Sequence, residues 1–279
     1  VLYGIAGLKV HAKIALVVRR EPDGIRRYVH LGTGNYNERT ARLYTDFGLL
    51  TAAEEFGSDA SGFFNTITGY SEPPVFNRLV MAPAGLRDKI LALIRREADW
   101  ARSGQNSGIL AKMNSLVDPL IIQELYAAAE AGVPIQLNVR GICCLRPGVP
   151  NLSERIRVVS IVDRYLEHSR AFVFRNGGTT EVYLSSADWM PRNLDRRVEL
   201  MFPILRVPLQ EKIIEALEAQ FADNQRARLL KPDGSYERIS QGRSESLRAQ
   251  EHLYARTLQE RDRVRSIAPM RYAPIEGKK

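Results

Sequence analysis

Two segments far apart in the chain carry the same order of chemically active side chains, and this repeat limits the possible folds more than any other feature. The first copy holds His11 and Lys13 within the apolar run 8–18, and the second holds His168 and Arg170 before another apolar run. The alternation of apolar and polar residues predicts a strand at each place, with the histidine and the cation on one face. An isolated His-x-Lys is most often a solvent-facing pair on a strand, so its repetition gives the motif its weight.

The residues that follow each histidine also repeat. In both copies a second short strand ends in small polar residues and is followed by an arginine and a carboxylate. A shift of 153 positions pairs Thr33 with Ser186, Asn35 with Asp188, Arg39 with Arg192 and Asp46 with Glu199. A duplicated unit of this kind is expected to build one two-fold site where the copies meet.

This order of residues resembles the phospholipase D superfamily, in which two His-x-Lys half-sites share one phosphoryl-transfer centre. Longer blocks resemble the polyphosphate kinase family between residues 5 and 265. The family's proteins are longer, so the resemblance implies a C-terminal catalytic portion. The implied fold is α/β, with two phospholipase D-like domains of mixed sheet flanked by helices, the first incomplete at its N-terminus. The blocks that carry the resemblance are 8–13, 28–37, 40–49, 111–118, 138–143 and 185–193.

The order of predicted strands and helices is itself an α/β pattern. Asp23-Gly24 predicts a hairpin between the first two strands, and the prolines after Ser71 predict a boundary near 71–80. We expect a first catalytic domain in 1–75, a second in 76–265 and a disordered tail in 266–279. Helices are expected over 52–69, 85–102, 119–131, 208–224 and 244–265, and strands over 109–113, 135–139 and 156–162.

Composition limits the partners and the compartment. The chain has 279 residues, 44% of them hydrophobic, and a net charge of +8, which favours polyanionic partners. Its two cysteines, Cys143 and Cys144, are adjacent, so they predict no structural disulfide and a reducing, cytoplasmic setting. No apolar run approaches the length of a membrane-spanning helix.

The resemblance implies a polyphosphate kinase that works through covalent catalysis. No phosphate-binding P-loop motif is present in the sequence. Instead, His11 would attack the γ-phosphorus of ATP, and the phosphohistidine would pass its group reversibly to inorganic polyphosphate. An imidazole attacks through its unprotonated nitrogen, so a carboxylate must hold the other one. We expect Asp46 to orient His11, with Glu199 as the counterpart for His168.

Further site residues follow from matching positions in the family. His168 is expected to contact the nucleotide phosphates and to serve as a general acid. Arg170 stands two residues after it, where the superfamily has a lysine. This substitution argues against His168 as a second nucleophile. Tyr44 and Arg140 match ATP-binding positions. His30 and His252 are expected to be structural. Phosphoryl oxygens would be stabilised by Lys13, Lys112, Asn114, Arg39 and Arg192.

Cofactors and partners are also implied by the resemblance. Mg²⁺ would accompany ATP, with ligands upstream of this chain, because no carboxylate cluster here has metal-ligand spacing. The partners would be ATP or ADP, polyphosphate and further copies of the protein, with no nucleic acid, and the location cytoplasmic with peripheral association at the inner membrane. Two alternatives stay open. One is a phospholipase D-like phosphodiesterase or nuclease, although its second lysine is missing, and the other is a non-catalytic polyanion-binding fragment.

Overall fold

The strands form one large mixed sheet and two small sheets. The computed structural model describes residues 4–5, 7–69, 74–239 and 245–266. The large sheet has ten strands, nine of them in the order β1-β13-β12-β11-β7-β8-β9-β14-β15, with β6 pairing β13. β7, β8 and β9 run parallel, as does β1 with β13, and the other neighbours are antiparallel. The strands are β1 (Lys9–Val10), β6 (Val80–Ala82), β7 (Ile109–Met113), β8 (Ile135–Val139), β9 (Ile156–Ile161), β11 (Arg170–Phe174), β12 (Glu181–Ser185), β13 (Arg197–Pro203), β14 (Ala227–Leu230) and β15 (Tyr236–Arg238).

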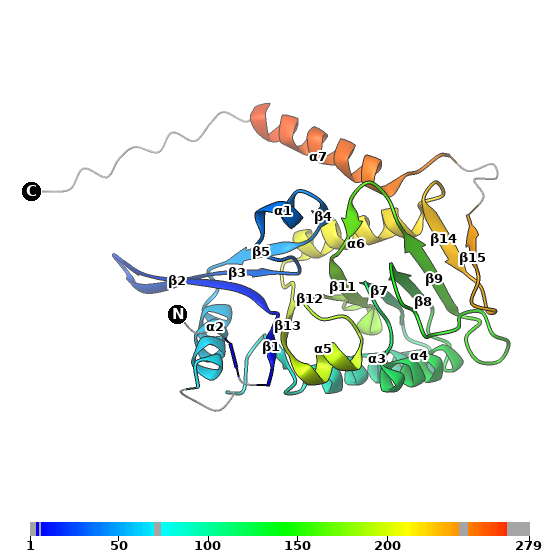
Figure 1. Cartoon of the computed structure of the whole chain (residues 1–279), viewed down its shortest axis with the longest axis horizontal. Helices are drawn as coiled ribbons and strands as arrows, with labels where there is room; N and C mark the ends of the chain where they lie inside the picture. The colour runs from blue at the N-terminus through cyan, green and yellow to red at the C-terminus, as the bar shows by residue number, and fades with distance from the viewer. Residues whose placement is uncertain (1–3, 6, 70–73, 240–244, 267–279) are drawn as a thin grey trace, which may run out of the picture.

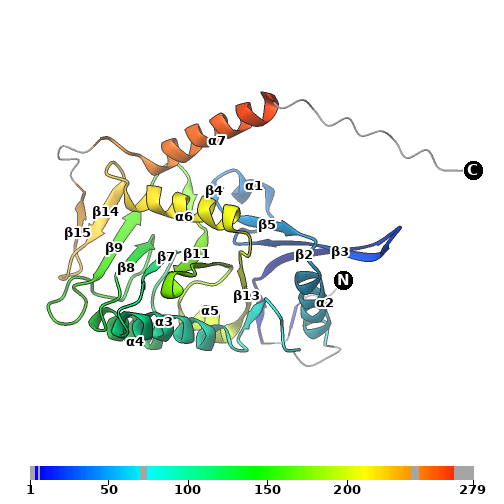
Figure 2. The same cartoon turned by 180° about the vertical axis from the view of Figure 1, so that it is seen from behind.

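Helices cover both faces of the large sheet. One face carries α3 (Leu86–Arg102) and α4 (Pro119–Glu130), with the short α5 (Pro191–Arg196) beside them. The other carries α6 (Val207–Phe221), and α7 (Ala249–Ser266) lies outside α6 (Figures 1 and 2). Successive side chains of β11 point to opposite faces of the sheet. Phe172 packs in the core under α3 and α4, and Val173 packs in the core on the opposite face. The sheet is therefore buried on both sides, as its near-continuous apolar strands require.

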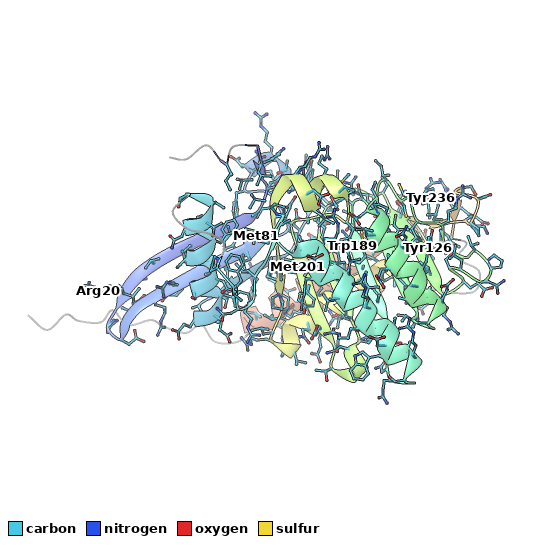
Figure 3. The ribbon with its side chains drawn as sticks, turned by 90° about the horizontal axis from the view of Figure 1, so that it is seen from below. Arg20, Met81, Tyr126, Trp189, Met201 and Tyr236 are labelled. Carbon is cyan, nitrogen blue, oxygen red and sulfur yellow. The ribbon has the colours of Figure 1, made fainter. Side chains whose placement is uncertain are left out.

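The N-terminal segment adds a protruding hairpin to this body. Strands β2 (Lys13–Glu21) and β3 (Gly24–Gly32) form the hairpin and continue to β5 (Gly48–Thr51). Arg20 marks its tip, away from the large sheet (Figure 3). Between β3 and β5 lie α1 (Glu38–Ala41) and β4 (Tyr44–Thr45). Strand β4 pairs with β10 (Leu166–Glu167) of the second segment. A 3₁₀ turn (Asn176–Gly178) precedes β12 in that segment.

Among the described residues, the hairpin sheet shares its core with the large sheet. Helix α2 (Glu54–Ile67) packs Phe56 and Phe63 in one cluster with Val29 of β3 and with Leu200 and Phe202 of β13. Burial of these side chains removes apolar surface from water across both halves of the chain, so the halves stabilise each other. The division at residue 75 stays a prediction.

The α/β prediction with a mixed sheet is confirmed, and the expected helices are present with shifts of a few residues at their ends. The expected strand 8–18 is wrong as a single element, because it is interrupted at His11 and Ala12. The N–H groups of both residues donate to the carbonyl of Val198, at 2.9 and 3.0 Å, instead of joining the β2 ladder. The expected disordered tail lies outside the described residues, apart from Ser266 at the end of α7.

Candidate active site

Two very short strands deliver the two histidines to the site. β1 runs parallel to β13 with Val10 opposite Val198, so the next residues along, His11 and Glu199, face each other. β10 runs parallel to β4 with Glu167 opposite Thr45, and His168 in the same way comes to face Asp46. Each repeat thus places its histidine beside the carboxylate of the other repeat.

The His11 pair is formed with a carboxylate that is fully buried. Nδ1 of His11 lies 2.8 and 2.9 Å from the two carboxylate oxygens of Glu199, which is 0% exposed. The hydroxyl of Ser186 also donates to Glu199. The imidazole side chain itself is 16% exposed, so one edge of the ring remains accessible.

The His168 pair repeats this arrangement. Nδ1 of His168 lies 2.9 and 3.0 Å from the carboxylate oxygens of Asp46, and the hydroxyl of Thr33 donates to Asp46 at 2.6 Å. The turn approaches Asp46 so closely at Gly34 that a Cβ there would lie 2.3 Å from Oδ2. Only glycine fits between the turn and this carboxylate.

The expected assignment of carboxylates to histidines is therefore wrong, although two of the expected equivalences between the repeats are confirmed. Thr33 and Ser186 take the same role, as do Asp46 and Glu199, but Asp46 holds His168 and Glu199 holds His11. The reason is the register of the parallel pairs β1–β13 and β4–β10, which join one repeat to the other.

The carboxylates determine the tautomer of both rings. An ionised carboxylate only accepts hydrogen bonds, so Nδ1 of each neutral imidazole carries the proton and donates it. Nε2 is then the unprotonated nitrogen in both rings. Among the described residues none makes a hydrogen bond to Nε2 of His11, which leaves that lone pair available to a phosphorus atom.

Lys13 is a buried cation that interacts with charged groups of both histidine–carboxylate pairs. It is 4% exposed, and its ammonium donates to the carbonyl of His11 at 2.5 Å. Burial lowers the pKa of Lys13 to about 7, and the repulsion of Arg170 acts in the same direction. The attraction of Glu199 and of Asp46, the carboxylate paired with His168, acts in the opposite direction. The amine is therefore close to its titration point at neutral pH.

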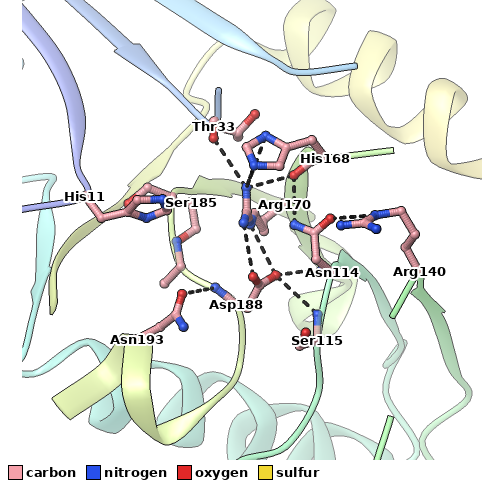
Figure 4. A network of polar contacts seen from close by, with 12 residues as sticks. His11, Thr33, Asn114, Ser115, Arg140, His168, Arg170, Ser185, Asp188 and Asn193 are labelled. Carbon is pink, nitrogen blue, oxygen red and sulfur yellow. Dashed lines mark hydrogen bonds and ion pairs between the residues drawn. The ribbon is translucent and has the colours of Figure 1, made fainter. Parts of the chain in front are cut away.

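Arg170 is fixed in a buried ion pair. Its Nε and Nη2 donate to the two oxygens of Asp188 at 3.2 and 3.0 Å, and Asp188 also accepts from the backbone N–H of Asn114. Burial acts to raise the pKa of Asp188, but Arg170 and the hydrogen bonds outweigh it and hold that pKa below its usual range. Figure 4 shows Arg170 between His11 and His168.

Three other predicted residues lie around the backbone of the His168 segment. The amide of Asn114 donates to the carbonyl of His168 at 3.1 Å, and Nε of Arg140 donates to Asn114 at 3.0 Å (Figure 4). Nε of Arg140 also donates to the carbonyl of Glu167 at 3.0 Å. Lys112, which is almost fully buried, donates to the hydroxyl and the carbonyl of Ser169. These contacts support the strand that carries the histidine.

Tyr44 lies against His168, while two predicted arginines are not brought into the site. The rings of Tyr44 and His168 are tilted by 45°, with centroids 5.0 Å apart. Arg39, on α1, and Arg192, at the start of α5, are exposed. Neither side chain has a hydrogen bond or an ion pair to any described residue, and no contact joins them to the histidines.

Sequence reasoning missed several supporting side chains. The sequence marks Ser186 and Asp188 only as members of the repeat, and Arg170 only as a substitution for the superfamily's lysine. Glu167 gave no signal, because a glutamate beside a histidine has no distinctive spacing. The buried Glu167 accepts hydrogen bonds from Thr45, Gln220 and Gln250, and lies 3.3 Å from the ammonium of Lys112.

The described residues contain no group of three or more His, Cys, Asp or Glu side chains placed to hold a metal ion. Asp46 and Glu199 are each bonded to a histidine and a hydroxyl, and Asp188 is bonded to Arg170. These carboxylates do not fit a magnesium site. No helix in the described part of the chain is long and apolar enough to cross a membrane.

Comparison with protein-family models gives two matches that together cover most of the chain. Residues 1–73 match the model described as polyphosphate kinase C-terminal domain 1, and residues 79–250 match polyphosphate kinase C-terminal domain 2. The second match alone covers more than half of the chain.

Individual relatives agree with these matches. A polyphosphate kinase of Rhodopirellula baltica is 55% identical over 262 residues, which is 94% of this chain and 31% of that protein. The crystal structure of polyphosphate kinase from Porphyromonas gingivalis matches with a TM-score of 0.87 and 42% identity, over 93% of this chain and 40% of that one. A phosphatidylserine synthase of Haemophilus influenzae, 12% identical with a TM-score of 0.50 over 86% of this chain and 69% of that one, shares only the fold. The chain spans about a third of the length of the curated relatives it matches.

Proposed function

Because the chain belongs to the polyphosphate kinase family, we propose that its full-length protein transfers the γ-phosphate of ATP to polyphosphate through a phosphohistidine at His11. The observation that supports this most is the His11–Glu199 pair, with Nδ1 held at 2.8 Å and Nε2 left without a partner among the described residues. A histidine with Nδ1 held by a carboxylate presents Nε2 as the nucleophile.

The first step makes one bond and breaks one. The lone pair of Nε2 forms an N–P bond to the γ-phosphorus, and the bond from that phosphorus to the bridging oxygen breaks, so ADP leaves with the electron pair. Glu199 stabilises the positive charge that forms on the ring, since Nδ1 keeps its proton and donates it to a carboxylate. Lys13, with its ammonium on the carbonyl of His11, supplies positive charge beside the transferred group.

The second step reverses the chemistry on another acceptor. A terminal phosphate oxygen of polyphosphate attacks the phosphorus, the N–P bond breaks, and its electron pair returns to Nε2. Both steps use the same residues, so the transfer also runs from polyphosphate to ADP. We assign the contacts with the nucleotide to His168 and to two residues beside it. The ring of Tyr44 lies against the ring of His168, and Arg140 donates to the carbonyl of the preceding residue, Glu167.

Magnesium and the assembly of the protein remain proposals that rest on the family alone. The carboxylates of the described site do not fit Mg²⁺, so we place its ligands outside this chain and route no step through it. We also propose a homo-oligomer in the cytoplasm, peripheral to the inner membrane. Light scattering and the release of the protein from membranes by salt test these two points.

Labelling of the protein tests the proposed function. Full-length protein incubated with γ-³²P-ATP is expected to retain label that survives base and is lost in acid, as a phosphohistidine does. His11→Ala should abolish the label, whereas His252→Ala, on the exposed side of α7, serves as the matched control and should keep it. Normal labelling of His11→Ala would refute the assignment. Cleavage of a labelled phosphodiester in place of labelling would favour the phospholipase D-like alternative.

A further inference from the structure

Arg170 differs from its counterpart in the first repeat in a way that affects proton transfer. It follows His168 by two positions, as Lys13 follows His11. A guanidinium keeps its charge at every physiological pH, whereas a buried lysine titrates, as Lys13 does with its pKa of about 7. The two halves of the site therefore have different cations beside their histidines.

Arg170 lies directly against the ring of His168. Its Nη1 is 3.1 Å from Nε2 and 3.4 Å from Nδ1, and it donates to the carbonyl of the same residue at 2.8 Å. Because Nη1 is nearly equally close to both ring nitrogens, the cation packs on the ring and does not point along one lone pair. Asp188 holds the other side of the guanidinium, so this placement is fixed.

The groups around His168 act on its protonation in opposite directions. Burial, Arg170 and Lys13 oppose a positive charge on the ring, and Asp46 favours one; the sum lowers the pKa of His168. Its neutral neighbours are the ring of Tyr44 and the amide of Asn114, which contacts the backbone carbonyl. The ring is thus neutral at neutral pH, with its single proton on Nδ1.

A neutral His168 of this tautomer has no proton on Nε2 to give to a leaving group. This matters little when the leaving group is a phosphate, because the oxygen of a terminal phosphate has a pKa of about 6 and departs as a stable anion. An alkoxide leaving from a diester is a much stronger base and needs a proton from a general acid.

We propose that Arg170 is a positioning residue that keeps His168 neutral and provides fixed positive charge in place of a proton, which makes this half of the site specific for phosphate leaving groups. The proposal rests on the proposed function and deepens it. It also replaces the expectation that His168 is a general acid.

Three variants test the proposal. Arg170→Lys keeps a cation at this position, because the adjacent carboxylate of Asp188 favours the charged ammonium. Arg170→Gln removes the cation, and Arg170→Gln combined with Asp188→Asn removes both charges of the buried pair. The double variant is included because Arg170→Gln alone leaves the Asp188 carboxylate buried without a partner. Thermal unfolding of each variant is recorded as a check on folding.

The first readout is the titration of His168, followed by NMR of ¹⁵N-histidine-labelled full-length protein, with the His168→Gln spectrum to assign its signals. We expect the pKa of His168 to rise by about one unit in the double variant, because only burial and Lys13 then oppose the effect of Asp46, and to stay low in Arg170→Lys. An unchanged pKa in the folded double variant would overturn the proposal.

The second readout is the rate of His11 labelling by γ-³²P-ATP. The double variant is expected to label about 100-fold more slowly and Arg170→Lys within about tenfold of the native rate. A native rate in the double variant would also overturn the proposal. If the native protein does not label at all, the proposed function fails, while the NMR titration still decides whether Arg170 controls His168.

Discussion

At the scale of single residues, the partner of Nδ1 decides what each histidine can do. His11 and His168 have the same type of partner and differ in the cation beside them, Lys13 for one and Arg170 for the other. The two histidines are therefore alike in their carboxylate partners but differ in the adjacent cation. In the proposed function this difference separates the nucleophile His11 from the nucleotide-binding His168.

The crossed carboxylates lead to a prediction that distinguishes them. Glu199→Gln should slow the labelling of His11 by about 100-fold, because the amide no longer stabilises the positive ring. Asp46→Asn should slow labelling less and mainly raise the ATP concentration needed, since Asp46 holds His168, to which we assign a contact with the nucleotide. Single-turnover labelling at several ATP concentrations measures both effects. The reverse order of effects would restore the pairing expected from the sequence.

Lys13 leads to a prediction about stability and pH. Its pKa is about 7 in the folded protein and near 10.5 when unfolded, so between these values the unfolded chain binds one more proton. Folding stability should then rise with pH across this window, by up to about 1.4 kcal/mol per pH unit from this group alone. Lys13→Met should lose this slope in urea denaturation at pH 7 and pH 9. Parallel slopes in native and variant protein would contradict it.

At the scale of elements, the interruptions at the histidines matter more than the regular strands. β1 and β10 are only two residues long, yet each ends directly before a histidine and pairs with the other repeat. Their parallel pairing fixes which carboxylate each ring meets. A continuous strand would keep His11 in the hairpin ladder and away from Glu199.

This arrangement predicts a strong effect from one backbone hydrogen bond. Ala12→Pro removes the N–H that donates to Val198 and should reduce His11 labelling at least tenfold, with a stability loss of roughly 1–3 kcal/mol. Ala12→Gly keeps the N–H and is the matched control. Labelling and urea denaturation of both variants check the prediction. Equal activity of the proline and glycine variants would show that the pairing is dispensable.

The sequence predicted the regular elements well and the junctions poorly. Residues 109–113 and 135–139 are strands as expected, because apolar runs bounded by turn residues are local signals. The breaks at His11 and His168 depend on acceptors about 120 to 190 residues away, Val198 and Thr45, which no local pattern contains. The same non-local pairing explains why the repeat identified Asp46 and Glu199 as site residues but did not show which histidine each one holds.

At the scale of the whole molecule, the first segment shares its core with the sheet of the second. Phe56 and Phe63 of α2 lie in one cluster with Leu200 and Phe202 of β13. The site residues are distributed across both segments in the same way. Stability and site geometry therefore depend on the same interface.

This shared core predicts one cooperative unfolding transition for the two segments. Phe56→Ala should destabilise the protein by about 3–5 kcal/mol and shift the whole transition, including the part reported by the buried Trp189 in the opposite core. Calorimetry together with tryptophan fluorescence measures it, with exposed Tyr36→Ala as the control. A transition at Trp189 that does not move would mean that the segments unfold independently.

The exchange of carboxylates between repeats resembles a domain-swapped dimer fused into one polypeptide. Neither repeat forms a complete histidine–carboxylate pair alone, because each supplies the carboxylate that holds the imidazole of the other. A substitution at position 199 therefore acts on the ring of His11, and one at position 46 acts on the ring of His168, so a change in one half of the chain alters the histidine of the other half.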